Sequence, residues 1–177
     1  MTVKEACEIL KIDARQLRMY KGEGRVRVIP IVNGGRKEYS YNTEDVYELA
    51  RCLNGPCTVP YFYAIEDKTT KEQMDYTEGK LRFFCSQQGY KGVRDVSVDV
   101  LDSLGEAEYP SFKSLRCLKQ LMKLVFEKKV ERIVLPSLDL FPQDLNFEIW
   151  RSFIKDLGVK EIAIVDRTTN PRQPYII

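Results

Sequence analysis

Eight of the 27 residues from Lys11 to Lys37 are lysine or arginine, and only Asp13 and Glu23 oppose them. The cations are Lys11, Arg15, Arg18, Lys21, Arg25, Arg27, Arg36 and Lys37. They give this stretch a net charge of +6, although the whole chain of 177 residues carries only +2. Concentrated cations neutralise the phosphates of a nucleic-acid backbone, so we expect double-stranded DNA to be a partner.

Two short helices are predicted to position the first of these cations. Thr2 and Glu5 have the spacing of a capping box, which favours a helix over Val3–Leu10. A second helix over Ala14–Lys21 buries Leu17 and turns three polar side chains outward, those of Arg15, Gln16 and Arg18. These lengths are typical of a helix-turn-helix, whose second helix enters the major groove of DNA.

A hairpin and a closing helix follow. Residues 26–32 and 36–41 read as two strands, and the Asn33-Gly34-Gly35 turn supplies the positive φ angles that a tight hairpin needs. Arg36 and Lys37 come directly after this turn, on a wing beside the second helix. A further helix is predicted over residues 43–53.

The motifs in residues 1–53 resemble the MerR-type winged helix. The resemblance rests on Leu17-Arg18-Met19-Tyr20, Gly24, and Gly34-Gly35-Arg36-Lys37-Glu38-Tyr39 followed by Thr43-Glu44-Asp45. It implies that Arg15, Gln16 and Arg18 belong to the recognition helix and that Arg36 and Tyr39 belong to the wing. The charge pattern adds four residues to the expected DNA-binding set, namely Lys21, Arg25, Arg27 and Lys37.

Beyond a predicted linker at residues 54–59, the pattern changes to strands alternating with helices. Strands are predicted over 61–65, 93–98, 132–135 and 161–165, and helices over 71–88, 111–128 and 146–157. This alternation indicates an α/β domain over residues 60–166 with a mostly parallel sheet flanked by helices. Residues 167–177 contain two prolines and no periodicity, so we expect a loose tail.

A winged helix before a small α/β domain resembles the serine recombinases of transposons, which have a resolvase-like catalytic domain. The scaffold motifs are Tyr63-Ala64, Lys71-Glu72-Gln73, Gly89-Tyr90 and Lys129-Val130-Glu131-Arg132-Ile133-Val134. The resemblance implies a serine that attacks a DNA phosphate and arginines that neutralise the developing charge. This chain instead has Ile65, Glu66 and Asp67 at the positions of the family's Arg-Val-Ser, and it has no arginine between Arg132 and Arg151. We therefore expect no catalytic residues and no enzyme activity.

Other chemistries have weaker support. Thr69, Thr70 and Ser137 are possible substitute nucleophiles, although such residues are more often ordinary polar loop residues. Glu66, Asp67 and Asp139 suggest a magnesium site, but no recognised ligand spacing accompanies them. The chain has no histidine, and its five cysteines show no metal-ligand spacing. We expect neither a metal nor a cofactor.

These observations predict a DNA-binding protein whose inactive recombinase-like domain forms a homodimer or a higher homo-oligomer. It would regulate or organise a DNA element. The alternatives are an active recombinase with a displaced nucleophile and a regulator that senses an effector at the carboxyl ends of its strands. No apolar run suggests a membrane segment, so we expect a cytoplasmic, nucleoid-associated location, or the nucleus or a viral factory in a eukaryotic host.

Overall fold

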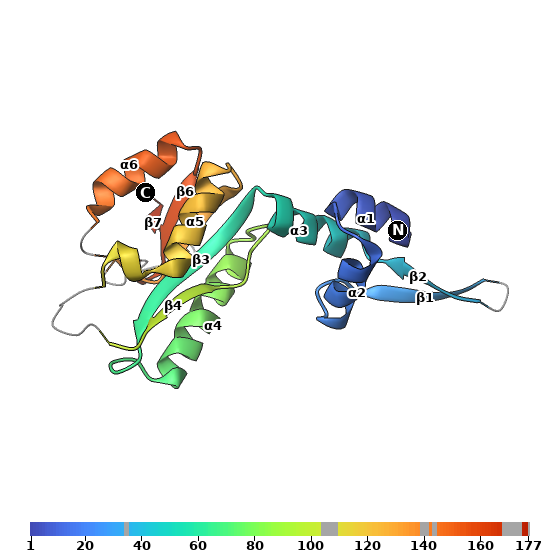
Figure 1. The fold of residues 1–177 in the computed structure, drawn as a ribbon, viewed down its shortest axis with the longest axis horizontal. Helices are drawn as coiled ribbons and strands as arrows, with labels where there is room; N and C mark the ends of the chain where they lie inside the picture. The colour runs from blue at the N-terminus through green and yellow to red at the C-terminus, as the bar shows by residue number, and fades with distance from the viewer. Residues whose placement is uncertain (34–35, 104–109, 139–141, 143–144, 168–174, 177) are drawn as a thin grey trace. The chain divides into compact units, whose positions relative to one another are not determined.

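The chain forms two compact units, Met1–Gly55 and Pro56–Ile177 (Figure 1). The computed structural model describes residues 1–33, 36–103, 110–138, 142, 145–167 and 175–176, without the side chains of residues 32–33, 36–38, 167 and 175–176. A small helical unit with a hairpin precedes a sheet flanked by helices, which confirms the predicted α/β fold class.

The first unit contains the elements that the sequence predicts. They are α1 (Val3–Leu10), α2 (Ala14–Gly22), β1 (Val28–Asn33), β2 (Arg36–Tyr41) and α3 (Thr43–Asn54). Thr2 and Glu5 form the expected capping box at the start of α1. The three helices and the hairpin enclose one apolar core, which is made of Ala6, Leu10, Leu17, Val26, Tyr41, Val46 and Leu49.

The hairpin has the register that the Asn-Gly-Gly sequence favours. The strands are antiparallel, with Val28 opposite Tyr41 and Asn33 opposite Arg36, so a two-residue turn connects them. Residues 34–35 of this turn lie outside the described residues. The core includes Tyr41 and, partly buried, its partner Val28, so the base of the wing is anchored to the helices.

The second unit is a three-layer domain around the sheet β4–β3–β5–β6–β7. Its strands are β3 (Cys57–Ile65), β4 (Ser97–Leu101), β5 (Val130–Leu135), β6 (Glu161–Ile164) and β7 (Tyr175–Ile176). Strands β3, β4, β5 and β6 are parallel, so their carboxyl ends lie at the same edge of the sheet. Strand β7 is antiparallel to β6. The helices are α4 (Lys71–Gln87), α5 (Arg116–Phe126) and α6 (Phe147–Asp156), and 3₁₀ turns lie at Phe112–Ser114 and Val165–Arg167.

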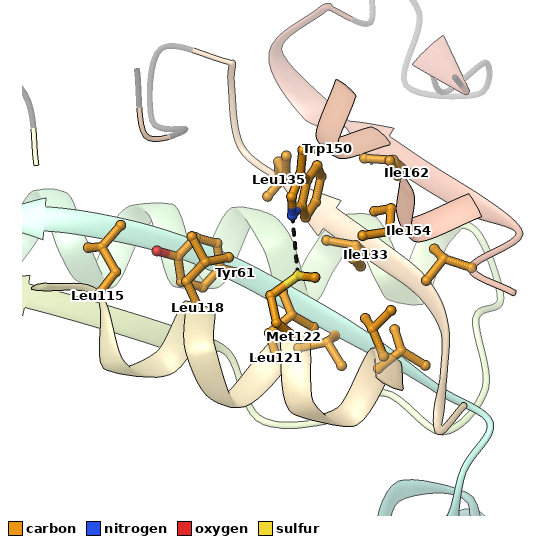
Figure 2. Packing of buried hydrophobic residues seen from close by; sticks show 14 of the residues in the cluster. Tyr61, Leu115, Leu118, Leu121, Met122, Ile133, Leu135, Trp150, Ile154 and Ile162 are labelled. Carbon is orange, nitrogen blue, oxygen red and sulfur yellow. Dashed lines mark hydrogen bonds between the residues drawn. The ribbon is translucent and has the colours of Figure 1, made fainter. Parts of the chain in front are cut away.

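Alternate residues of β3 enter two different cores. Phe62 and Ala64 pack toward α4, where Leu81, Phe84 and Cys85 cover one face of the sheet. Tyr61 and Tyr63 pack on the opposite face with α5 and α6, and Figure 2 shows part of this larger cluster. The indole Nε1 of Trp150 donates a hydrogen bond of 3.2 Å to the Met122 sulfur in this core. Helices therefore cover both faces of β3, which explains its nearly continuous burial.

Two predicted boundaries of the first strand region are wrong. The expected linker 54–59 is too long, because α3 runs to Asn54 and β3 already begins at Cys57. The strand extends through Pro60, which lacks a backbone N–H group. Pro60 is tolerated there because residues 94–96, beside it on the β4 side, belong to no strand: pairing resumes only at Tyr61 and Ser97.

Three other boundaries differ from the prediction. The second strand occupies Ser97–Leu101 instead of 93–98, with only an isolated bridge at Val93. The helix predicted over 111–128 is broken at Leu115, so Ser111 caps a 3₁₀ turn and α5 starts at Arg116. The tail includes β7, which pairs with Ala163 and Ile164, so it is not wholly loose; residues 168–174 and 177 lie outside the described residues.

The late start of α5 has a cause in a distant residue. Leu115 at its N-cap offers no side-chain hydrogen bond, but the buried carboxylate of Asp99 on β4 accepts the backbone N–H groups of Cys117 and Leu118 at 2.8 and 3.0 Å. These are two of the donors that a helix leaves unpaired at its first turn. The sheet therefore supplies the cap that fixes where α5 begins.

Candidate nucleic-acid interface

The second helix of the first unit presents one exposed, mainly basic face. Asp13 caps α2 by accepting the backbone N–H groups of Arg15 and Gln16, each at 2.8 Å. Leu17 is fully buried, which fixes the rotation of the helix about its axis. Arg15, Arg18 and Met19, at helical spacing, lie on the exposed side. Met19 is 52% exposed, and its place among the cations was not anticipated from the sequence.

Gln16 has a structural role in addition to any contact with DNA. Its side-chain oxygen Oε1 accepts the backbone N–H of Asp13 at 3.2 Å, which completes a capping box. The spacing of Asp13 and Gln16 carries the signal for this box. With Oε1 engaged there, the Nε2 donors are the natural groups of Gln16 for a contact to another molecule.

The last turn of α2 contacts the wing. The Nζ of Lys21 lies 3.6 Å from the centre of the Tyr39 ring, a cation–π contact between the helix and β2. The Arg25 guanidinium carbon lies 5.6 Å from the centre of the Tyr20 ring, just beyond the helix. Four residues of the first unit, two of them aromatic, thus join the end of α2 to the wing and to the segment before β1.

Arg27 is held by a carboxylate that sequence reasoning did not connect to it. Its guanidinium donates two hydrogen bonds to Asp45 on α3, at 2.8 and 2.7 Å, and its backbone N–H donates a third of 2.8 Å to the same carboxylate. The Arg27 guanidinium holds the pKa of Asp45 below its ordinary value. The pairing neutralises one charge of the predicted basic patch and joins the start of the wing to α3.

The remaining predicted residues of the wing are placed by backbone only. Arg36 and Lys37 begin β2, opposite Asn33 and Val32, and their side chains lie outside the described residues. Tyr39 is described and is 43% exposed. Of the predicted DNA-binding set, the structure therefore brings Lys21 to Tyr39 and keeps Arg15 and Arg18 on the exposed face of α2, while it pairs Arg27 with Asp45.

The positions expected to hold a degenerate active site lie at the carboxyl end of β3. Ile65 is half-buried at the last position of the strand, while Glu66 and Asp67 are exposed in the turn that follows. The backbone N–H of Glu66 donates to the Leu101 carbonyl at 2.8 Å, which ties this turn to the end of β4. Asp139, the third member of the suggested magnesium site, lies outside the described residues.

The candidate substitute nucleophiles have hydrogen-bonding roles in the fold. The Thr69 hydroxyl accepts the backbone N–H of Ile65 at 3.4 Å, and the Thr70 hydroxyl caps α4 by accepting the N–H of Gln73 at 3.3 Å. Ser137 follows β5 at the same edge of the sheet. A surface hollow of about 450 Å³ lies beside this edge, lined by Lys68, Thr69, Glu72, Gln73, Tyr76 and Thr77.

The described part of the chain contains neither a cluster suited to a metal ion nor a helix suited to crossing a membrane. None of its histidine, cysteine, aspartate and glutamate side chains form a group of three or more suited to a metal ion. The described helices lack the length and apolar character that a membrane crossing requires.

Comparison with protein families gives a match that covers the first unit. Residues 1–53 match the family described as MerR HTH family regulatory protein. Searches of curated proteins and of solved structures found no match to this chain. The matched range coincides with the helices and hairpin of the first unit, which is therefore similar to the MerR-type helix-turn-helix domain.

Proposed function

We propose, from the premise that residues 1–53 form a MerR-type helix-turn-helix domain, that this protein reads specific sequences of duplex DNA. The observation that carries the proposal is the exposed face of α2, where Arg15 and Arg18 lie beside Met19. An arginine that enters the major groove binds a guanine through two hydrogen bonds, and an apolar side chain contacts a thymine methyl group. The face combines both kinds of group on one helix.

The neighbouring cations fit contacts to the DNA backbone. Lys21, in the last turn of α2, and Arg25, just beyond the helix, lie beside the aromatic rings of Tyr39 and Tyr20, which limit the positions that their charged groups take. Phosphate contacts set the register of a protein on DNA without reading its sequence. Because Arg27 pairs with Asp45, we assign it a role in stabilising the domain and no direct contact with DNA.

The α/β domain is assigned a non-catalytic role. Serine recombinases need a serine nucleophile and a cluster of arginines, and the corresponding turn of this chain presents the exposed carboxylates of Glu66 and Asp67. Carboxylates repel a DNA phosphate that arginines would otherwise neutralise, so this edge of the sheet is unsuited to the serine-recombinase mechanism. The order β3–α4–β4–α5–β5 is compatible with the recombinase resemblance that the sequence motifs suggest. We assign this domain to holding copies of the DNA-binding domain together, at half-sites of a regulated or organised DNA element.

The DNA-binding part is tested by selecting bound duplexes from a random pool and measuring affinity for the selected site by fluorescence anisotropy. Arg18→Ala is expected to weaken binding about ten- to a hundredfold, since a bidentate contact to a base is worth about 1–3 kcal/mol. Arg51→Ala is the matched control, because it removes an equal charge from an exposed position of α3 in the same domain. Equal effects of the two substitutions would contradict the proposal.

The catalytic part is tested with a nicked duplex that traps covalent protein–DNA intermediates. We expect no adduct on the selected site at any protein concentration. A phosphoseryl or phosphothreonyl adduct mapped to Thr69, Thr70 or Ser137 would overturn the non-catalytic assignment and support the displaced-nucleophile alternative.

A second candidate function rests on the hollow of about 450 Å³ at the carboxyl edge of β3. Open α/β sheets bind small molecules at this edge, so an effector there would make the protein a ligand-responsive regulator. A melting shift with one class of metabolite, abolished by Gln73→Ala, would favour this function. The absence of any shift across a broad metabolite panel would remove it.

A further inference from the structure

Helix α4 exposes two large aromatic side chains on its outer side, and one of them, Tyr76, also lines the hollow at the carboxyl edge of β3. Tyr76 and Phe83 are 72% and 63% exposed, and they lie seven residues apart on the same side of the helix. The opposite side, with Leu81, Phe84 and Cys85, is buried against the sheet, and Figure 1 shows α4 as the green helix. The exposed side therefore points away from the domain, toward solvent.

A glycine lies between the two aromatic residues. Gly79 is exposed, in the interior of α4, where glycine is the least favourable residue after proline. A Cβ atom added there would meet nothing within 4 Å. The fold of the unit itself gives no reason for a glycine at this position. A small residue on a helix surface does allow the backbone of another helix to approach closely.

We propose that this face of α4, formed by Tyr76, Gly79 and Phe83, is where two copies of the chain meet across a two-fold axis. The inference rests on the proposed oligomerising role of the α/β domain. The midpoint between Tyr76 and Phe83 falls beside Gly79, so two antiparallel α4 helices place each tyrosine against the partner's phenylalanine. The two glycines then meet near the axis, which is the self-complementarity that a two-fold interface requires.

The charges at the edge of this face are complementary under the same symmetry. Asp75 and Arg82 both lie along the same lateral edge of this face of α4. Asp75 precedes the midpoint of the face at Gly79, and Arg82 follows it. Antiparallel pairing brings Asp75 of one copy within about 3 Å along the helix axis of Arg82 of the other, at 1.5 Å of rise per residue. Within its own chain Arg82 pairs with Glu78 at 2.7 Å and, more distantly, with Asp95 at 3.9 Å, while no ion pair among the described residues involves Asp75. The partner copy supplies a cation for that carboxylate.

The test measures the dimer dissociation constant of the full chain by analytical ultracentrifugation. Phe83→Arg and Tyr76→Arg are each expected to weaken association at least about tenfold, because they bury a charge at the centre of the interface. Ile149→Arg is the matched control, since Ile149 on α6 is 69% exposed but lies beside the groove between α5 and α6. A dimer that survives both α4 variants, or that Ile149→Arg disrupts instead, would overturn the assignment.

Two further variants separate association from folding. Gly79→Leu is expected to raise the melting temperature of the monomer, measured at concentrations below the dimer dissociation constant, because the monomer has room for the side chain. It should also weaken the dimer at least about tenfold by blocking close approach. Asp75→Arg and Arg82→Asp should each weaken the dimer, and the double variant should restore it. Failure of that restoration contradicts the charge pairing.

Affinity for a DNA half-site distinguishes this inference from the proposed function. Half-site binding is expected to be equal in the wild type and in Phe83→Arg. A wild-type protein that is monomeric at every concentration yet binds a half-site would refute the α4 dimer and leave the DNA-binding proposal intact. A wild-type protein that does not bind a half-site would refute the DNA-binding proposal instead.

Discussion

The hydroxyl of Tyr61 donates a hydrogen bond of 3.1 Å to the carboxylate of Asp99, and both groups are buried in the α/β domain. The same carboxylate receives two backbone N–H groups from the start of α5. One side chain therefore connects β3, β4 and α5. Burial, together with this carboxylate, raises the pKa of Tyr61 well above its ordinary value, so the hydroxyl keeps its proton and remains a donor.

Removal of this carboxylate is expected to destabilise the α/β domain more than removal of the hydroxyl. Tyr61→Phe loses one hydrogen bond, worth about 1 kcal/mol. Asp99→Ala loses the cap and also leaves a buried hydroxyl unpaired, so we expect a loss of about 3 kcal/mol. Urea unfolding of the two variants measures the difference. Equal losses would show that the cap contributes little.

The contact between Lys21 and Tyr39 is expected to matter for DNA affinity rather than for sequence choice. Lys21→Met retains most of the side-chain packing and removes the charge, so it should weaken all duplexes alike. The slope of log affinity against log salt should fall by about one. Anisotropy titrations at several salt concentrations measure both effects. A change of preferred sequence without a change of slope would assign Lys21 to base recognition.

The pairing of Arg27 with Asp45 predicts a pH dependence of stability. The folded-state pKa of Asp45 is lowered, so the pair stabilises the first unit above the unfolded-state pKa of aspartate, about 4. This stabilisation is lost as the pH falls through the lower folded-state value. The difference in unfolding free energy between wild type and Asp45→Asn should therefore be largest at neutral pH and shrink below about pH 4.

Hydrogen exchange of the α3 amides, including that of Val46, measures this difference residue by residue. The α/β domain is the internal control, because its amides should show no effect of Asp45→Asn at any pH. A difference that grows as the pH falls would contradict the direction of the pKa shift.

Cys85, together with the fully buried Cys57, is expected to be among the slowest thiols to react with alkylating reagents in the native protein. Burial raises the pKa of Cys85 to about 11, so little thiolate forms at neutral pH, and its side chain is 1% exposed. Cys7 and Cys117 are partly exposed and should react first. Mass spectrometry of timed alkylation measures the order. Early labelling of Cys85 would indicate that α4 detaches readily from the sheet.

Local patterns predicted the first unit well. The capping box at Thr2 and Glu5, the register of the hairpin and the burial of Leu17 each depend on residues close together in sequence, and each is confirmed. The exposed positions of Arg15 and Arg18 follow from the same helical spacing. The predicted site was incomplete where the real site depends on contacts between distant residues. Nothing in the sequence near Arg27 indicates that it pairs with Asp45, 18 positions later.

In the second unit too, the predictions failed where the structure depends on residues distant in sequence. Pro56 and Pro60 suggested a linker, yet Pro60 fits inside β3 because of where pairing with the β4 side resumes. The start of α5 depends on Asp99, which lies on another strand, so the hydrophobic periodicity alone placed the helix too early. The short strand β7 is defined by its pairing with β6, a contact across the tail that no local pattern encodes.

Trp150, the single tryptophan of the chain, is packed between α5 and α6 in the α/β domain. The helix-turn-helix domain contains tyrosines but no tryptophan. Selective excitation of the indole therefore gives an intrinsic optical signal that belongs to one unit alone, with no label or mutation. Melting curves from this fluorescence coincide with curves from tyrosine absorbance if the two units unfold cooperatively, and they separate if each unit melts on its own.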